Sequence, residues 1–236
     1  MGLLELKDLT REYTRGGRAF NAVDCVNLSV ESGDFVSIIG RSGSGKSTLL
    51  NMSAGLITPS RGNVFFDGID IHRLNDRDVS LFRNGQIGYV PQGQCLLSYL
   101  TVLENVCIPL FLFKRAGEPA EQLKIRRRAI ELLEKTGISH LAASYPRELS
   151  GGEMRRVAIA RSLINNPSLV IADEPTSDLD AETTTEIMQM LSAIARERTA
   201  SASQTAVLIV THEIDAHNFG NKTYVMNDGK LTIKPN

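Results

Sequence analysis

An α/β fold with one helical insertion is predicted by three features of the sequence. Short, almost continuous apolar runs, typical of strands buried on both faces, occur at 35–40, 168–173 and 206–212. The first run leads into helix-like sequence that begins at Lys46, as expected for strands joined by helices. Between the first run and the later two, residues from about 100 to 165 are mostly helical in pattern.

The bulk composition is that of an ordinary globular protein. The chain has 236 residues, of which 42% are hydrophobic and 22% are charged, so it can bury a sizeable core. We expect one domain, 1–236, with a core of about 1–92 and 166–236 and a helical subdomain of about 93–165. The formal net charge of −1 lacks the basic excess of nucleic-acid binders, so no nucleic acid partner is expected.

Further strands are expected on either side of the helical region. The segments 3–9 and 22–30 read as N-terminal strands, and 62–71 and 86–92 read as two more strand regions. The sequence YVMNDGKLTI is typical of a hairpin, because its Asp-Gly pair suits a tight two-residue turn.

Three helices can be placed from their caps and apolar positions. Thr101 and Glu104 form a capping box for the first helix, and Gly137 ends the second, at 120–137. The second helix is expected to bury one apolar face: Leu123, Ile130 and Leu133. The third helix, 181–198, carries its own apolar stripe: Ile187, Met190, Leu191 and Ile194. A surface loop is expected at 199–205, where small residues follow this helix.

The sequence GRSGSGKS, residues 40–47, predicts a phosphate-binding loop. It fits the pattern G-x-x-x-x-G-K-[ST] and lies between an apolar strand and a helix, which is the context this motif requires. Gly43 and Gly45 let the backbone curl so that its N–H groups point at phosphate oxygens. Lys46 is expected to reach the β- and γ-phosphates, and the Ser47 hydroxyl to bind Mg²⁺.

Polar residues follow the later apolar runs. Asp173 and Glu174 end one run, and neighbouring side chains of a strand point to opposite faces, so we expect the two acids to have separate tasks. Asp173 is assigned to Mg²⁺ through water and Glu174 to polarising the attacking water. His212, at the end of the last apolar run, is placed to bind the γ-phosphate or to hold the water with Glu174. Gln92 could complete the Mg²⁺ shell.

A second glycine pair lies about a hundred residues beyond the first. In LSGGE, Ser150, Gly151, Gly152 and Glu153 precede an apolar helical pattern, so their N–H groups form a second anion-binding helix start. This site lacks the lysine, the hydroxyl for magnesium and the carboxylates, so it can bind a phosphate but cannot hydrolyse one. It therefore makes sense as a half-site that completes a site elsewhere.

The ordered motifs GRSGSGKS, VPQ, LSGGE, LVIADE, SDLD and VTHE resemble the nucleotide-binding subunit of ATP-binding cassette (ABC) transporters over nearly the whole chain. The resemblance implies a phosphate-loop ATPase core with a mixed sheet, an N-terminal antiparallel β subdomain and an inserted α-helical subdomain. It also implies a head-to-tail homodimer in which each ATP lies between residues 40–47 of one chain and 150–153 of the other.

The resemblance assigns roles to individual residues. Tyr13 would stack on adenine, Asp180 would lie in the loop between the two sites, and His212 would be the switch. Lys46, Glu174 and His212 form the implied catalytic set, and Ser47, Gln92 and Asp173 the implied Mg²⁺ ligands. The residues expected to contact ATP are Tyr13, Gly40, Ser42, Gly43, Ser44, Gly45, Lys46, Ser47, Thr48 and Gln92. The resemblance implies ATP and Mg²⁺ as the cofactors.

Within the family, FRNGQIGYVPQ, LLSYLTVLENV and IADEPT are similar to the MacB/LolD/FtsE branch, whose subunits drive membrane partners in export, lipoprotein release or force transmission across the envelope. Two departures are Glu153, where Gln is commoner, and SDLD, where this branch often has GNLD. The resemblance places the chain at the cytoplasmic face of the membrane, held there by an integral permease-type partner. The alternative is a soluble ABC-type ATPase of DNA repair or chromosome maintenance.

The partner is expected to dock near 93–113. Four residues there are more apolar than a surface loop requires: Leu96, Leu97, Tyr99 and Leu100. Burial within the helical subdomain explains them as well as docking does. The three cysteines, Cys25, Cys95 and Cys107, lack metal-ligand spacing and are expected to be small buried hydrophobic residues.

Overall fold

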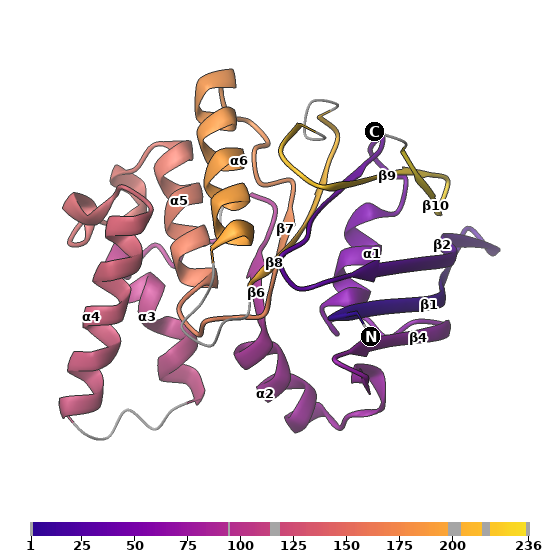
Figure 1. Cartoon of the computed structure of the whole chain (residues 1–236), viewed down its shortest axis with the longest axis horizontal. Helices are drawn as coiled ribbons and strands as arrows, with labels where there is room; N and C mark the ends of the chain where they lie inside the picture. Colours follow the sequence, from indigo (N-terminus) through magenta and orange to yellow (C-terminus); the bar gives the residue numbers. More distant parts are fainter. Residues whose placement is uncertain (1, 94, 114–118, 198–203, 214–217, 235–236) are drawn as a thin grey trace.

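The computed structural model describes residues 2–93, 95–113, 119–197, 204–213 and 218–234. Two sheets and six α-helices are found in these ranges (Figure 1). The strands are β1 Leu4–Arg15, β2 Arg18–Val30, β3 Phe35–Ile39, β4 Arg61–Phe66, β5 Ile69–Asp70, β6 Ile87–Val90, β7 Leu169–Asp173, β8 Ala206–Thr211, β9 Lys222–Asn227 and β10 Lys230–Ile233.

The α-helices are α1 Lys46–Ser53, α2 Asp76–Gln86, α3 Val102–Phe113, α4 Pro119–Lys135, α5 Gly151–Ser162 and α6 Ala181–Arg196. Short 3₁₀ turns lie at Ile71–Arg73, Ser139–Leu141 and Pro146–Glu148. None of the α-helices in the described ranges is long and apolar enough to cross a membrane.

The larger sheet is mixed and has the strand order β10-β9-β3-β8-β7-β6. The neighbours β9, β3, β8, β7 and β6 pair in parallel, and only β10 pairs antiparallel, through the hairpin predicted at Asp228. The smaller sheet, β2-β1-β4-β5, is antiparallel. The α/β fold with a mixed sheet and an N-terminal antiparallel sheet is therefore confirmed.

Two hydrophobic cores cover the two faces of the larger sheet. In Figure 1 the strands β6–β8 lie between the helices α3–α6 on one side and α1 with the smaller sheet on the other. Alternate residues of one strand serve the two cores: in β8, Val207 and Ile209 face the helical side, whereas Leu208 and Val210 face α1. This burial on both faces explains why the strands read as continuous apolar runs.

The predicted helix ends are confirmed, but one predicted face is wrong. The Thr101–Glu104 capping box forms, and the Ile138 N–H donates to the Leu133 carbonyl to close the end of α4. In α4, however, Leu123 and Ile130 are exposed. The buried face is Ile125, Ala129, Leu132 and Leu133. The helix carries two apolar stripes, and packing against α3 and α5 selects the one with spacing i, i+4, i+7, i+8.

One further expectation is corrected in the smaller sheet. In this sheet β1 runs to Arg15 and β2 starts at Arg18, so only Gly16 and Gly17 form the turn between them. Cys25 is exposed rather than buried, whereas Cys107 is buried and Cys95 is intermediate. Cys25 has a φ of 50° at an irregularity in the β1–β2 pairing, which turns its thiol outward to donate to Asp8 Oδ1 at 3.5 Å. Of the predicted loop 199–205, residues up to 203 lie outside the described residues.

An ion pair between buried Asp34 and partly exposed Lys222 links the start of β3 to β9. The Asp34 carboxylate accepts hydrogen bonds from Lys222 Nζ (2.6 Å), Asn221 Nδ2 (2.7 Å) and the Glu31 N–H (2.7 Å). Burial alone would raise the pKa of Asp34, but these hydrogen bonds outweigh it and hold the pKa below its usual value of 3.8.

Asp34→Asn should lower the free energy of unfolding at neutral pH by about 2 kcal/mol, because it removes the charge of a buried carboxylate that accepts three hydrogen bonds. The folded pKa is depressed, so this stabilisation is present above the unfolded value of 3.8 and is lost as the pH falls through the folded value. Urea unfolding from neutral pH down to about pH 3 should show the difference from wild type shrinking in the acid range. The matched control is Asp24→Asn, which removes the carboxylate 3.8 Å from the mostly exposed amino group of Lys230. Equal effects of the two variants at neutral pH would contradict this account.

Candidate active site

The loop between β3 and α1 has the tight backbone that the motif predicts. Gly43 and Gly45 have φ angles of 79° and 104°, which side chains other than glycine rarely adopt. A Cβ on Gly45 would lie 1.9 Å from the Ala22 carbonyl oxygen, whereas a Cβ on Gly43 would meet nothing within 4 Å. The loop is therefore packed against β2 on one side and open on the other, and it ends at the N-terminus of α1.

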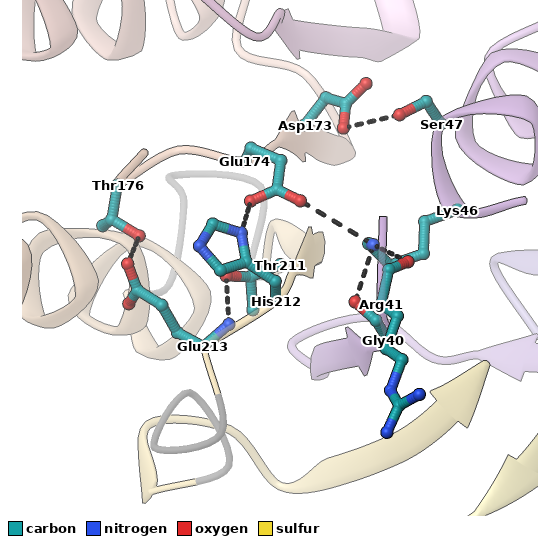
Figure 2. Close-up of polar contacts among 10 residues, drawn as sticks. All are labelled: Gly40, Arg41, Lys46, Ser47, Asp173, Glu174, Thr176, Thr211, His212 and Glu213. Atoms are coloured by element: carbon teal, nitrogen blue, oxygen red, sulfur yellow. Dashed lines mark hydrogen bonds and ion pairs between the residues drawn. The ribbon is translucent and has the colours of Figure 1, made fainter. Parts of the chain in front are cut away.

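Lys46 lies inside this loop rather than extending to solvent. Its Nζ donates to the carbonyl oxygens of Gly40 (2.8 Å) and Arg41 (3.0 Å), and it lies 3.7 Å from Glu174 Oε1 (Figure 2). Only 6% of the side chain is exposed, so its positive charge is held at the mouth of the loop. A lysine in this position attracts an anion that enters the loop.

Asp173 and Ser47 form a pair of oxygen donors beside the lysine. Ser47 Oγ donates to Asp173 Oδ1 at 3.1 Å (Figure 2). Burial raises the pKa of Asp173, and the nearby charge of Glu174 raises it further, although the Ser47 hydrogen bond opposes both. A buried carboxylate next to a hydroxyl is a donor set that suits Mg²⁺, which completes its shell with water and substrate phosphates. No cluster of three or more acidic, His or Cys side chains that could hold a metal ion occurs among the described residues.

Glu174 reaches its position through an unusual backbone conformation. Strand β7 ends at Asp173, and Glu174 has a φ of 49°. Glu174 is therefore not a strand residue, and the rule that neighbouring strand side chains point to opposite faces of the sheet does not apply to it. The two carboxylates nevertheless have different partners: Asp173 contacts Ser47, whereas Glu174 contacts Lys46 and His212. The Glu174 N–H is held by the Val210 carbonyl at 2.9 Å, which fixes the turn.

His212 follows β8 and contacts Glu174 directly. Its Nδ1 lies 2.6 Å from Glu174 Oε2, which is a short hydrogen bond (Figure 2). The histidine side chain is 59% exposed, whereas that of Glu174 is only 11% exposed. One edge of the imidazole is thus fixed by a buried carboxylate while most of the ring remains accessible.

Lys46, Ser47 and Glu174 line one cleft of about 330 Å³, whereas Asp173 and His212 are not in its lining and contact it through Ser47 and Glu174. Its lining comes from the phosphate loop, β1, β2 and the ends of β6 and β7: Tyr13, Phe20, Ala22, Ser42, Gly43, Gly45, Lys46, Ser47, Thr48, Gln92 and Glu174. The predicted residues Gly40 and Ser44 lie in the same loop but not in this lining. Most of the predicted ATP contacts are therefore brought together.

Aromatic side chains form one end of the cleft. The rings of Tyr13 and Phe20 lie 6.2 Å apart, and the Arg11 guanidinium lies 4.9 Å from the Tyr13 ring. Phe20 was not predicted as a site residue. Its signal was the Gly16–Gly17 pair, because a two-residue turn there places Phe20 opposite Tyr13 in the hairpin.

The second glycine pair starts helix α5, as predicted. Ser150 caps this helix: its N–H and its hydroxyl donate to Glu153 Oε2 at 2.7 and 2.8 Å, and its Oγ accepts from the Glu153 N–H at 3.3 Å. These hydrogen bonds lower the pKa of Glu153, so the carboxylate is ionised at the start of the helix. None of residues 150–153 lines the cleft described above. Gly151 lines a separate cavity of about 150 Å³.

Asp180 is the N-cap residue of α6, as Ser150 is of α5. It caps α6 by accepting from the Thr183 N–H (2.9 Å) and hydroxyl (2.7 Å). A Cβ on Gly152 would lie 2.6 Å from Thr183 Cγ2, so the starts of α5 and α6 are in close contact. The Ser150 and Asp180 caps are therefore parts of one packed surface.

Comparison with known proteins agrees with this architecture. A family model described as "ABC transporter" matches residues 23–177. The "Uncharacterized ABC transporter ATP-binding protein MJ0796" of Methanocaldococcus jannaschii is 40% identical over 230 residues, covering 97% of this chain and 95% of that protein. The chain therefore belongs to the ABC transporter family. It is an ATP-binding cassette, an ATPase that hydrolyses ATP to ADP and phosphate.

Solved structures of ATP-binding cassettes are also similar to this chain. The "Dimeric structure of a post-hydrolysis state of the ATP-binding cassette MJ0796 bound to ADP and Pi" has a TM-score of 0.87 at 39% identity, covering 98% of this chain and 97% of that one. The structure of cbiO1 from Clostridium perfringens, "Part of the ABC transporter complex cbiONQ", has a TM-score of 0.83 at 30% identity, covering 98% and 87%.

Gly45→Ala should destabilise the protein far more than Gly43→Ala. Both replacements place a side chain at positive φ, which costs about 1–2 kcal/mol, but only the first also puts a Cβ against the Ala22 carbonyl. Thermal unfolding of the two variants against wild type measures the difference. Equal losses of stability would contradict the packing of the loop against β2.

Proposed function

We propose that this chain is the motor subunit of a transporter of the MacB/LolD/FtsE branch, in which ATP closes two copies head to tail and the closure drives a separate membrane protein. One observation carries the proposal. Lys46 and Glu174 line one cleft and His212 is hydrogen-bonded to Glu174, whereas the capped start of α5 at Ser150 lies outside this cleft. One copy therefore presents a hydrolytic half and a separate anion-binding half.

In the hydrolytic half, the loop at 40–47 would hold the triphosphate. The Lys46 amino group would leave the carbonyl oxygens of Gly40 and Arg41 for the β- and γ-phosphates, since an oxyanion is a stronger acceptor than a carbonyl. Tyr13 would stack on the adenine at the aromatic end of the cleft, with Phe20 supporting it from the next strand.

Mg²⁺ would be held by the Ser47 hydroxyl, Asp173 and Gln92, and its charge, when bound, offsets the negative charge of the phosphates. Support comes from the Ser47–Asp173 contact at 3.1 Å and from the position of Gln92 in the cleft lining. A nearby cation would also favour the ionised form of Asp173, whose pKa burial raises.

Hydrolysis would be an in-line transfer of the γ-phosphoryl group to water, catalysed by positioning and by charge neutralisation. Glu174 would orient and polarise the attacking water. His212 would contact the γ-phosphate through the accessible part of its ring while its Nδ1 stays on Glu174. The His212–Glu174 hydrogen bond thus ties the group that positions the water to the group that detects the phosphate.

In the anion-binding half, Ser150 and the N–H groups of α5 would complete the ATP site of the other copy. The dimeric structures solved for MJ0796, one of which contains ADP and Pi, support a dimer for this chain as well. Asp180 would lie between the two ATP molecules, because its helix start packs directly against that of α5.

A membrane partner would dock on the helical side, near 93–113. Several large apolar side chains are exposed there, among them Tyr99 (72%) and Leu112 (73%). A hollow of about 310 Å³ is lined by Pro109 of α3, three residues before Leu112, and also by Leu56 and Arg161 of α5. The partner would hold the chain at the cytoplasmic face of the membrane, and closure of the dimer would move it.

The direct test is Glu174→Gln. This variant should bind ATP but hydrolyse it at least a hundredfold more slowly, as a rough estimate, and should therefore accumulate as an ATP-bound dimer. Light scattering with and without ATP measures the mass. The control is Glu131→Gln on the exposed face of α4, which should remain an active ATPase. A Glu174→Gln protein that stays monomeric at saturating ATP and high protein concentration would overturn the proposal.

A further inference from the structure

Two loops of the site are joined by a second contact besides the one between His212 and Glu174. Thr176 Oγ1 donates to Glu213 Oε1 at 2.9 Å (Figure 2). Thr176 follows Glu174 by two residues, and Glu213 follows His212 directly. The same two segments are thus linked twice, once by the catalytic pair and once by the Thr176–Glu213 pair.

The second contact fixes the backbone on the C-terminal side of His212. On the N-terminal side, Thr211 is buried in β8 and pairs with Ile39 of β3. On the other side, the Glu213 N–H donates to Thr211 Oγ1 at 3.0 Å, and the Glu213 carboxylate accepts from Thr176, which is only 2% exposed. The imidazole is mostly exposed, so these contacts together with Glu174 determine where the ring points.

Thr176 is also connected to the start of α5 through Leu179. Its carbonyl accepts from the Leu179 N–H at 3.3 Å, and Leu179 Cδ2 lies 3.3 Å from the position of a Cβ on Gly151. A chain of contacts therefore runs from Glu213 through Thr176 and Leu179 to the glycine pair. A shift of the loop at 176–179 would be passed to the backbone that carries His212.

We propose that Glu213 is a positioning residue for hydrolysis, which acts through Thr176 to hold His212 in register with Glu174. This inference rests on the proposed function, because it assigns a task to His212. Glu213 itself touches neither ATP nor the water in this scheme. Its carboxylate sets the distance between the loop that carries the catalytic acid and the loop that carries the histidine.

The test separates a hydrogen bond that positions His212 from one that only stabilises the fold. Thr176→Val and Glu213→Ala remove the contact, whereas Thr176→Ser and Glu213→Gln keep a donor and an acceptor in place. The first two should lower kcat for ATP roughly tenfold while KM changes by less than about twofold, because a small misplacement affects the transition state more than binding. The second two should retain most of the wild-type kcat.

A double-variant cycle gives the second measurement. Because both changes remove one contact, Thr176→Val combined with Glu213→Ala should lose no more kcat than the worse single variant. The double variant Glu174→Gln, Thr176→Val should still form ATP-dependent dimers, measured by light scattering, as Glu174→Gln alone does. That result distinguishes loss of positioning from failure of the proposed dimer.

Three results would overturn the inference: wild-type kcat in Thr176→Val, multiplicative losses in the double variant, or equal losses in the removing and the conservative variants. A drop in thermal stability together with a rise in KM, without a separate effect on kcat, would also overturn it, since a contact that only stabilises the fold would behave in that way. Absence of ATP-dependent dimers in Glu174→Gln alone would instead count against the proposed function.

Discussion

Parallel pairing of β3, β8 and β7 is the constraint on which the site depends. Ile39 of β3 pairs with Thr211 of β8, and Asp173 of β7 pairs with Val210, so all three strands end at the same level. The phosphate loop, the two acids and the histidine leave the sheet there, although they are far apart in sequence. Continuous apolar burial on both faces of these strands fixes that register, because a slip would put every side chain on the wrong face.

The same sheet also separates the two halves of the proposed reaction. Its α1 side carries the loop that would hold the triphosphate, and its helical side carries α5 with the capped Ser150. In the anion-binding half, the Glu153 carboxylate already accepts hydrogen bonds from the Ser150 hydroxyl and N–H. A phosphate that approaches this helix would compete with an ionised side chain for the same donors. The Thr176–Glu213 contact in turn links the loop beside this helix to the histidine of the hydrolytic half.

Local patterns in the sequence predicted the parts of the structure that local chemistry determines. The phosphate loop, the cap at Thr101, the helix start after Ser150 and the buried strands follow from short spacings, and all are present. The buried face of α4 could not be predicted, since Leu123 and Ile125 begin alternative stripes and only tertiary packing selects one. The conformation of Glu174 and the contact of Glu213 were also missed, because the first depends on a rare φ and the second on a partner distant in sequence. Phe20 was missed although the local turn at Gly16–Gly17 places it opposite Tyr13.

The central claim is that one chain cannot complete the reaction, and a mixture of two inactive variants tests it most directly. Lys46→Ala loses the phosphate-loop lysine but keeps Ser150, whereas Ser150→Arg blocks the start of α5 but keeps Lys46. Each alone should hydrolyse almost no ATP, and an equal mixture should regain part of the wild-type rate, since each mixed dimer contains one complete site. Replacing Ser150→Arg in the mixture by the double variant Lys46→Ala, Ser150→Arg should abolish the gain. A Ser150→Arg protein that hydrolyses ATP at the wild-type rate alone, or folded variants that never complement each other, would contradict the account.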